Sequence, residues 1–306
     1  MKLILLFCLL AVEPLLGGLE CFFKEATGKI ECQQMRNIDF IYMINLDERP
    51  EKFATSAEQL ADYGIVPYRF SAVNGWQLPI TTINALGTPY DPSMKKAWGT
   101  FYFLQGDGSI GFAHEIMGTS NGKIYFCHCM ARGTIGIVLS HLSILHDAYK
   151  AGYTTVLIME DDIQIIRNPH LLSDRIDELD AIVGKEGWDI LFSDRDTRGQ
   201  NGQYVPCTSC AWRPGCPLFP SDRFFQRYTI SRNLRRIGAR YGAYSMVVRR
   251  SGMKKILDFF NTHQIFLPFD MEYTLPKDIK LFTVIDDIIS TLPKALSDNS
   301  APNYLY

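Results

Sequence analysis

The stretch that decides the fold is TVLIMEDD, residues 155–162. Its first five residues are apolar or β-branched, as in a strand buried on both faces of a sheet. Three carboxylates follow at once, and the carboxyl ends of strands form the ligand crevice in open α/β sheets. In an extended segment Glu160 and Asp162 point the same way. Such a pair suits Mn²⁺ or Mg²⁺, which completes its coordination shell with phosphate oxygens and water. The alternative is a solvated acidic loop.

Apolar patterning on both sides of this stretch alternates between strands and helices. The pattern predicts helices at residues 50–63, 134–149, 171–183 and 251–260, the last capped by Ser251, with a further helix around 231–236. It predicts strands at residues 39–46, 66–73, 155–159, 188–192, 244–249 and 281–285. This alternation is typical of an α/β protein with a mainly parallel sheet covered on both faces. Residues 76–132 follow neither period. A loop of this length inside a compact domain is either functional or contains elements that the pattern does not reveal.

Composition and charge narrow the class of protein. The chain has 306 residues, of which 47% are apolar, so it can bury a full core and is not disordered. Its net charge is −2, which argues against a general polyanion binder, and no nucleic-acid partner is expected. Residues 195–250 nevertheless hold eleven Arg, no Lys and two acids, a net charge of +9. That segment predicts one local anionic ligand.

The N-terminus has the layout of an export signal. Lys2 precedes an apolar run at residues 3–12, and Gly17 and Gly18 follow. We expect residues 1–18 to be a cleavable signal peptide or a short apolar anchor, since the run is too short to cross a bilayer of roughly 30 Å as a helix. The alternative is a buried N-terminal helix or strand.

The eight cysteines allow two interpretations. Cys21 and Cys32 could form a disulfide near the mature N-terminus. Five other cysteines could form disulfides, remain thiols or bind zinc. They are Cys127, Cys129, Cys207, Cys210 and Cys216. Their spacing matches no strong zinc signature, so disulfides or plain thiols are favoured.

Two polar loops are candidate ligand sites. Asn45 lies at the end of the first predicted strand and Arg49 follows it, where Arg49 could reach a phosphate. Helix capping by Asp47 explains the loop equally well. The glycine-rich segment GTIG, residues 133–136, opens a helix that carries Ser140 and His141. Backbone N–H groups at such an entry can face an anion. A packed or capping His141 is the alternative.

Asp270 is a candidate base. It follows Pro268 and Phe269, and burial in an apolar turn would raise the pKa of its carboxyl group. The alternative is a helix cap or a surface turn.

Together these pieces resemble glycosyltransferase family 25, the family of lipopolysaccharide and procollagen galactosyltransferases. The resemblance runs from about residue 38 to 298, with Thr134, Ile137 and Asn74 where the family usually has Glu, Cys and Asp. The segments that carry it are INLDER (44–49), FSAVNG (70–75), GTIGIVLSH (133–141), EDD (160–162), GAY (242–244) through Lys254-Lys255, and Asp270.

The resemblance implies a GT-A type fold, a nucleotide-binding α/β sheet flanked by helices, as one domain over residues 36–306 with a Cys/Arg-rich insert at about 196–240. It implies inverting transfer of galactose or glucose from a UDP-sugar to a glycan, lipooligosaccharide or hydroxylated protein, assisted by Mn²⁺ or Mg²⁺. The implied roles are metal binding by Glu160 and Asp162, donor binding by Asn45, Arg49, Ser140, His141 and Asp161, and catalysis by Asp270.

Two other functions stay open: a catalytically degenerate relative that binds a glycan or a protein, and a metal-dependent phosphohydrolase. A UDP-sugar donor and an export signal together predict the ER lumen or export. In a bacterium the N-terminus could instead hold the enzyme at the cytoplasmic face of the inner membrane. The oligomeric state is left open.

Overall fold

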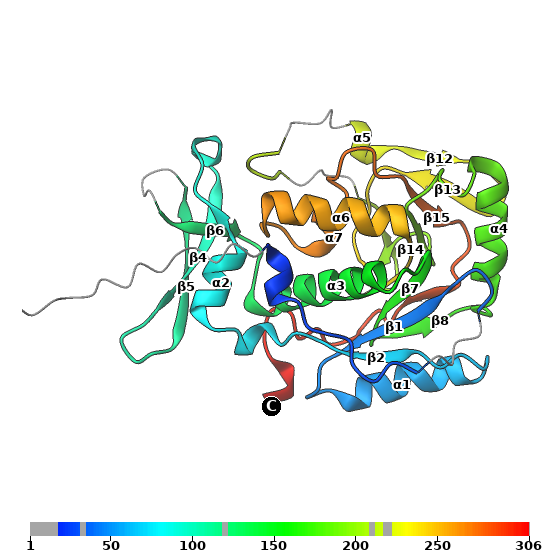
Figure 1. The fold of residues 1–306 in the computed structure, drawn as a ribbon, viewed down its shortest axis with the longest axis horizontal. Helices are drawn as coiled ribbons and strands as arrows, with labels where there is room; N and C mark the ends of the chain where they lie inside the picture. Colours follow the sequence, from blue (N-terminus) through cyan, green and yellow to red (C-terminus); the bar gives the residue numbers. More distant parts are fainter. Residues whose placement is uncertain (1–17, 31–34, 118–121, 208–211, 217–221, 306) are drawn as a thin grey trace, which may run out of the picture.

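The computed structural model describes residues 18–30, 35–117, 122–207, 212–216 and 222–305. Within these ranges the main feature is a sheet of eight strands (Figure 1). Their order across the sheet is β12 (Arg227–Thr229), β13 (Leu234–Ile237), β15 (Leu281–Val284), β9 (Ile190–Phe192), β14 (Ser245–Arg249), β7 (Thr155–Glu160), β1 (Phe40–Asn45) and β2 (Tyr68–Ser71).

The sheet is mixed. Strand β1 runs parallel to both β2 and β7, and β9 runs parallel to β15. Strand β14 lies antiparallel between β7 and β9, and β13 pairs antiparallel with both β12 and β15. The β1 and β7 strands end side by side, so the polar residues after each strand meet at one edge of the sheet.

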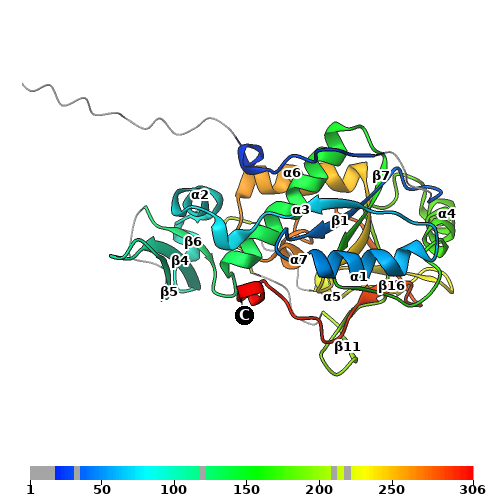
Figure 2. The same cartoon turned by 90° about the horizontal axis from the view of Figure 1, so that it is seen from below.

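Side chains alternate between the two faces along each buried strand, so both faces of the sheet are apolar. Helices cover both faces. One face of β1 carries Phe40, Tyr42 and Ile44 into the core formed with α3 (Arg132–Lys150) and α6 (Arg250–His263). Its other face packs against the second helix pair, α1 (Pro50–Ala61) and α4 (Leu171–Val183). Figures 1 and 2 show the two pairs on opposite sides of the sheet.

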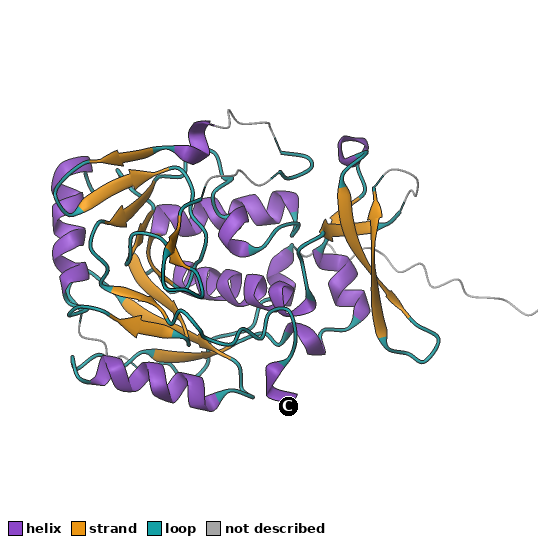
Figure 3. Ribbon diagram, turned by 180° about the vertical axis from the view of Figure 1, so that it is seen from behind, coloured by secondary structure: helices purple, strands orange, loops and turns teal. Residues whose placement is uncertain are grey.

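Residues 76–132 contain a second, four-stranded antiparallel sheet, so this stretch is not a long loop and the alternative of unrevealed elements holds. It lies beside the main body with α2 (Ile80–Leu86) next to it (Figure 3). Its strand order is β3 (Thr88–Pro89), β6 (Ile124–Cys127), β4 (Trp98–Leu104) and β5 (Ile110–Ile116).

Short elements complete the described chain. Two antiparallel pairs are β8 (Ile163–Ile165) with β16 (Ile289–Thr291), and β10 (Thr197–Arg198) with β11 (Tyr204–Val205). The remaining helical turns are η1 (Leu19–Phe22), η2 (Gly75–Gln77), η3 (Pro92–Met94), α5 (Asp222–Phe225), α7 (Phe269–Glu272) and η4 (Asn303–Leu305).

Two local predictions are wrong. The helix expected around 231–236 is a turn followed by β13, because Ser231 Oγ accepts the N–H groups of Asn233 and Leu234 and β13 then pairs with two strands. Ser251 does not cap its helix. The cap position is Arg249, and the Ser251 hydroxyl donates to Asp189 Oδ1 at 2.7 Å.

The α/β class with a helix-flanked sheet is confirmed and is consistent with a GT-A-like fold. The sheet that was expected to be mainly parallel is mixed, because β13 and β14 run antiparallel to both of their neighbours. Among the described residues, no helix is both long and apolar enough to cross a membrane. The signal or anchor predicted for residues 1–18 lies almost entirely outside those ranges, as do Cys32 and Cys210.

Candidate active site

A small pocket lies where β1 and β7 end. Its volume is about 70 Å³. Five of the eight residues predicted for the site line it: Asn45, Ser140, Glu160, Asp161 and Asp162. The topology explains this meeting, because parallel neighbours deliver the residues that follow them to the same edge.

The three carboxylates after β7 are crowded and poorly solvated. Burial is the main cause that raises the pKa of Glu160 to about 8, of Asp162 to about 7 and of Asp161 to about 6, and the neighbouring acids add to each shift. Asn45 Nδ2 donates to Asp161 Oδ2 at 2.6 Å. Asp162 Oδ1 is buried and has no hydrogen-bond partner among the described residues. The cluster therefore holds carboxyl groups that are costly to ionise and one unsatisfied acceptor.

This donor set fits a hard divalent cation that takes further ligands from a substrate. Glu160 and Asp162 offer oxygens to one pocket, and the unpartnered Asp162 oxygen is available as a ligand. Within the described ranges, no group of three or more His, Cys, Asp or Glu side chains is arranged to hold a metal by itself. Two carboxylates would thus need phosphate or water oxygens to complete the shell.

Ser140 and His141 support the pocket from α3. Ser140 Oγ accepts the N–H of Val73 at 2.9 Å and donates to the carbonyl of Gly136. His141 is fully buried and stacks on Phe269 at 4.3 Å between ring centroids. Burial lowers the pKa of His141 to about 3, so the ring is neutral, and its Nε2 lies 3.3 Å from Glu160 Oε1. The alternative interpretation of His141 as a packed histidine therefore holds, although the ring also touches the Glu160 carboxyl group in the pocket.

The glycines at the start of α3 allow close packing. A Cβ on Gly136 would lie 2.4 Å from the carbonyl oxygen of Val73 and 2.5 Å from the nitrogen of Gly75. A Cβ on Gly133 would lie 2.4 Å from the carbonyl oxygen of Asn299. These glycines therefore bring the helix against two loops that line the pocket.

Arg49 does not line the pocket. Its Nη1 donates to both carboxylate oxygens of Asp298, at 2.7 and 2.9 Å, and its Nε donates to Glu51. Sequence reasoning missed Lys52 and Asp298, which do line it and whose Nζ and Oδ2 lie 3.0 Å apart. Lys52 could have been predicted, because it lies one helical turn after Arg49. Asp298 lies 246 residues further along the chain than Lys52.

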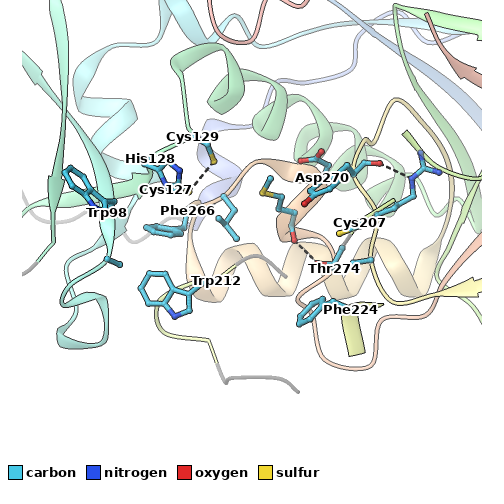
Figure 4. A pocket seen from close by; sticks show the side chains of 16 residues that line it. Trp98, Cys127, His128, Cys129, Cys207, Trp212, Phe224, Phe266, Asp270 and Thr274 are labelled. Atoms are coloured by element: carbon cyan, nitrogen blue, oxygen red, sulfur yellow. Dashed lines mark hydrogen bonds between the residues drawn. The ribbon is translucent and has the colours of Figure 1, made fainter. Parts of the chain in front are cut away.

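Asp270 lies in a separate, larger cavity of about 470 Å³. Its Oδ2 accepts the N–H of Gly242 at 2.9 Å, and burial raises the pKa of its carboxyl group. Its charge also acts on Glu160 and His141, so it lies close to the small pocket. Figure 4 shows Trp98, Trp212 and Phe266 toward one end of this cavity and Asp270 toward the other.

Much of the positive charge of residues 195–250 is used inside the protein. Arg240 pairs with Asp194, Arg213 with Glu272, Arg249 with Asp180 and Arg198 with Asp287. Arg223, Arg227 and Arg250 donate to backbone carbonyl groups. The net charge of +9 therefore gives little support to the anionic ligand expected from it.

Comparison with known proteins points to one family. The model of glycosyltransferase family 25 (LPS biosynthesis protein) matches residues 38–271. A glycosyltransferase 25 family member of Drosophila melanogaster is 25% identical over 60% of this chain and 25% of its own length. One of Aedes aegypti is 27% identical over 56% of this chain and 23% of its own.

An inactive glycosyltransferase 25 family member 3 of Mus musculus is 24% identical over 51% of this chain and 22% of its own length. The matched region thus spans about a quarter of the length of these curated relatives. The family model covers well over half of the present chain. The chain belongs to glycosyltransferase family 25.

Proposed function

We propose that this chain transfers galactose or glucose from a UDP-sugar to an acceptor hydroxyl with inversion at the anomeric carbon. The observation that carries the proposal is the crowded set Glu160, Asp161 and Asp162 in a pocket at the end of β7. Carboxyl groups with raised pKa values at such a position are typical of a functional site. Family membership supplies the reaction class.

In this proposal Glu160 and Asp162 would hold Mn²⁺ or Mg²⁺ in the donor pocket. When bound, the cation would stabilise the negative charge of the departing UDP. Asn45 orients Asp161 through its 2.6 Å hydrogen bond. Lys52 lines the same pocket and adds a positive charge for the diphosphate.

The acceptor hydroxyl would enter from the larger cavity, and Asp270 would take its proton. Burial raises the pKa of Asp270, which makes the carboxylate a stronger base than an exposed one. The Gly242 N–H fixes one carboxylate oxygen and leaves the other for the acceptor. A glycan, a lipooligosaccharide and a hydroxylated protein all carry a suitable hydroxyl group.

The test measures UDP release and product mass with the full chain, Mn²⁺ and either UDP-galactose or UDP-glucose. We expect Asp162→Asn to abolish turnover with the fold intact, and EDTA to do the same in the unaltered protein. Asp286→Asn is the matched control, because Asp286 is 71% exposed and pairs with Arg167 only at 3.7 Å. Release of inorganic phosphate in place of sugar transfer would instead support the phosphohydrolase.

A non-catalytic glycan- or protein-binding role is the second candidate, since relatives from Mus musculus and Homo sapiens are named inactive. A folded protein that binds UDP by calorimetry but turns over neither donor with any acceptor would support it. A protein that does not bind UDP at all would contradict the donor site itself.

A further inference from the structure

The sequence Cys127-His128-Cys129 lies at the wall of the larger cavity and has no part in the proposed transfer reaction. Cys127 is the last residue of β6, and its N–H donates to the carbonyl of Phe266 at 2.8 Å. Its own carbonyl accepts the N–H of Met130 at 3.0 Å. Two backbone hydrogen bonds therefore hold the turn that carries both thiols.

The two sulfur atoms are close enough to react with each other. Cys129 Sγ donates a hydrogen bond to Cys127 Sγ across 3.2 Å. A disulfide bond is about 2.05 Å long, so the sulfurs need to approach by only about 1.2 Å. Figure 4 shows this pair beside His128 at the cavity wall.

The surroundings favour a thiolate on Cys127. The hydrogen bond from Cys129 is the first cause that lowers the pKa of Cys127 to about 6, and His128, whose Nδ1 lies 3.6 Å from Cys127 Sγ, adds to the effect. The same hydrogen bond raises the pKa of Cys129, and the negative charge of Asp270 raises it further. One sulfur is thus a nucleophile near neutral pH while its neighbour keeps its proton.

We propose that Cys127 and Cys129 form a thiol–disulfide exchange site that accepts electrons from, or gives them to, low-molecular-weight thiols and disulfides. Both residues line the cavity of about 470 Å³, which gives a small disulfide access to Cys127 although that residue is only 9% exposed. The pairing of a low-pKa thiolate with an adjacent resolving thiol is the arrangement such exchange requires.

The reaction balances in two displacements. The Cys127 thiolate attacks one sulfur of the small disulfide, its S–S bond breaks, and the first small thiolate leaves. Cys129 then loses its proton to solvent and its sulfur attacks Cys127 Sγ, which releases the second small thiolate. The dithiol has been oxidised to one intramolecular disulfide, and the small disulfide has been reduced to two thiols.

The test equilibrates the full chain in mixtures of reduced and oxidised glutathione and reads the thiols by mass spectrometry after alkylation and trypsin digestion. Cleavage after Lys123 and Arg132 gives a peptide, residues 124–132, that contains Cys127 and Cys129 and no other cysteine. We expect this peptide to lose two hydrogens and all alkylation as the oxidised fraction rises. Cys21, an exposed thiol, gives the internal comparison.

Variants separate the two roles. Cys129→Ser should stop at a glutathione adduct on Cys127, and Cys127→Ser should slow oxidation of the remaining thiol at least tenfold. Cys216→Ser, the matched control, should leave the oxidation of peptide 124–132 unchanged. In the unaltered protein, alkylation of Cys127 should rise with pH around a midpoint near 6.

The proposal fails if peptide 124–132 stays fully alkylated at every glutathione ratio, a result that needs no variant to fold. It also fails if stoichiometric Zn²⁺ binds and protects both thiols, which would assign a metal site. Neither outcome depends on sugar transfer, so this test is independent of the proposed function.

Discussion

At the scale of one residue, Glu160 shows that a group in the candidate site lowers the stability of the folded protein. Its side chain is mostly buried, with 26% of it exposed, and this burial together with the charges of Asp161 and Asp270 raises its pKa to about 8. Ionising it in the folded protein therefore costs more free energy than in the unfolded chain. Such unfavourable groups persist where a bound ligand offsets them, which is why this residue is more informative than its sequence motif alone.

Replacing Glu160 by Gln should stabilise the ligand-free protein at high pH. Because the pKa is raised in the folded state, the contribution of Glu160 to stability is full below its ordinary value of 4.5 and is lost as the pH rises through about 8. The variant lacks that loss, so its advantage should grow between pH 5 and 8.5 and reach at least about 1.4 kcal/mol, the equivalent of one pKa unit. Urea unfolding at several pH values measures it.

The amide retains an oxygen that can accept from His141 Nε2, now 3.3 Å from Glu160 Oε1. The exposed Glu58→Gln on α1 is the control and should show no pH-dependent advantage. An advantage that stays constant with pH would contradict the raised pKa of Glu160.

At the scale of elements, the segment after β16 closes the small pocket. Asp298 is 8% exposed at its side chain and pairs with Arg49 and Lys52, while its carbonyl accepts the Trp76 indole N–H at 2.9 Å. One carboxylate thus neutralises two cations beside the proposed diphosphate site. The pocket of about 70 Å³ is too small for a whole UDP-sugar unless this segment moves.

Asp298→Asn should therefore tighten UDP binding. The neutral amide no longer neutralises Lys52, so this pocket-lining cation becomes available to the diphosphate, whereas Arg49 keeps its ion pair with Glu51. We expect the Kd for UDP, measured by calorimetry with Mn²⁺, to fall about tenfold, which corresponds to about 1.4 kcal/mol. Asp286→Asn should leave the Kd unchanged, and weaker binding by the Asp298 variant would show that this carboxylate supports the donor site.

The contact between α3 and the loop after β2 gives a second test at this scale. A Cβ at Gly136 would meet backbone atoms of Val73 and Gly75 at 2.4 and 2.5 Å, and neither can rotate away. Gly136→Ala should lower the free energy of unfolding by about 1–3 kcal/mol, measured by urea titration. Gly106→Ala, where nothing lies within 4 Å of the added Cβ, should change it far less, and equal losses would contradict this account.

These elements also show what the sequence could predict. The bounds of α4 match the prediction, β1 is shorter than predicted by one residue at each end, and β7 is longer by one residue at its end, because buried apolar runs and helical periodicity are local signals. The second sheet was missed because β3 has two residues and β6 four, and because Leu104 and Phe112 remain exposed. Lys52 and Asp298 were missed because their contact depends on how the whole chain folds.

At the scale of the whole molecule, charges that are segregated in the sequence are neutralised inside the fold. Arg240 and Asp194 form a pair with side chains 1% and 0% exposed, and Arg213 pairs with Glu272 at the same level of burial. Both arginines belong to the basic stretch, whereas Asp194 directly precedes that stretch after β9 and Glu272 lies in α7. The ion pairs therefore attach that stretch to the sheet and to α7.

Removing one member of either pair should destabilise the protein strongly, because the other charge is left buried without a counter-charge. Asp194→Asn and Glu272→Gln should each lower the free energy of unfolding by about 3–5 kcal/mol, while Asp258→Asn, which breaks an exposed pair with Lys254, should cost less than about 1 kcal/mol. Raising the salt concentration should reduce the small effect and leave the two large ones, since buried pairs are poorly screened. If 0.5 M NaCl abolished the effect of Asp194→Asn, that pair would be solvent-accessible and the basic stretch would be free to bind an anionic acceptor after all.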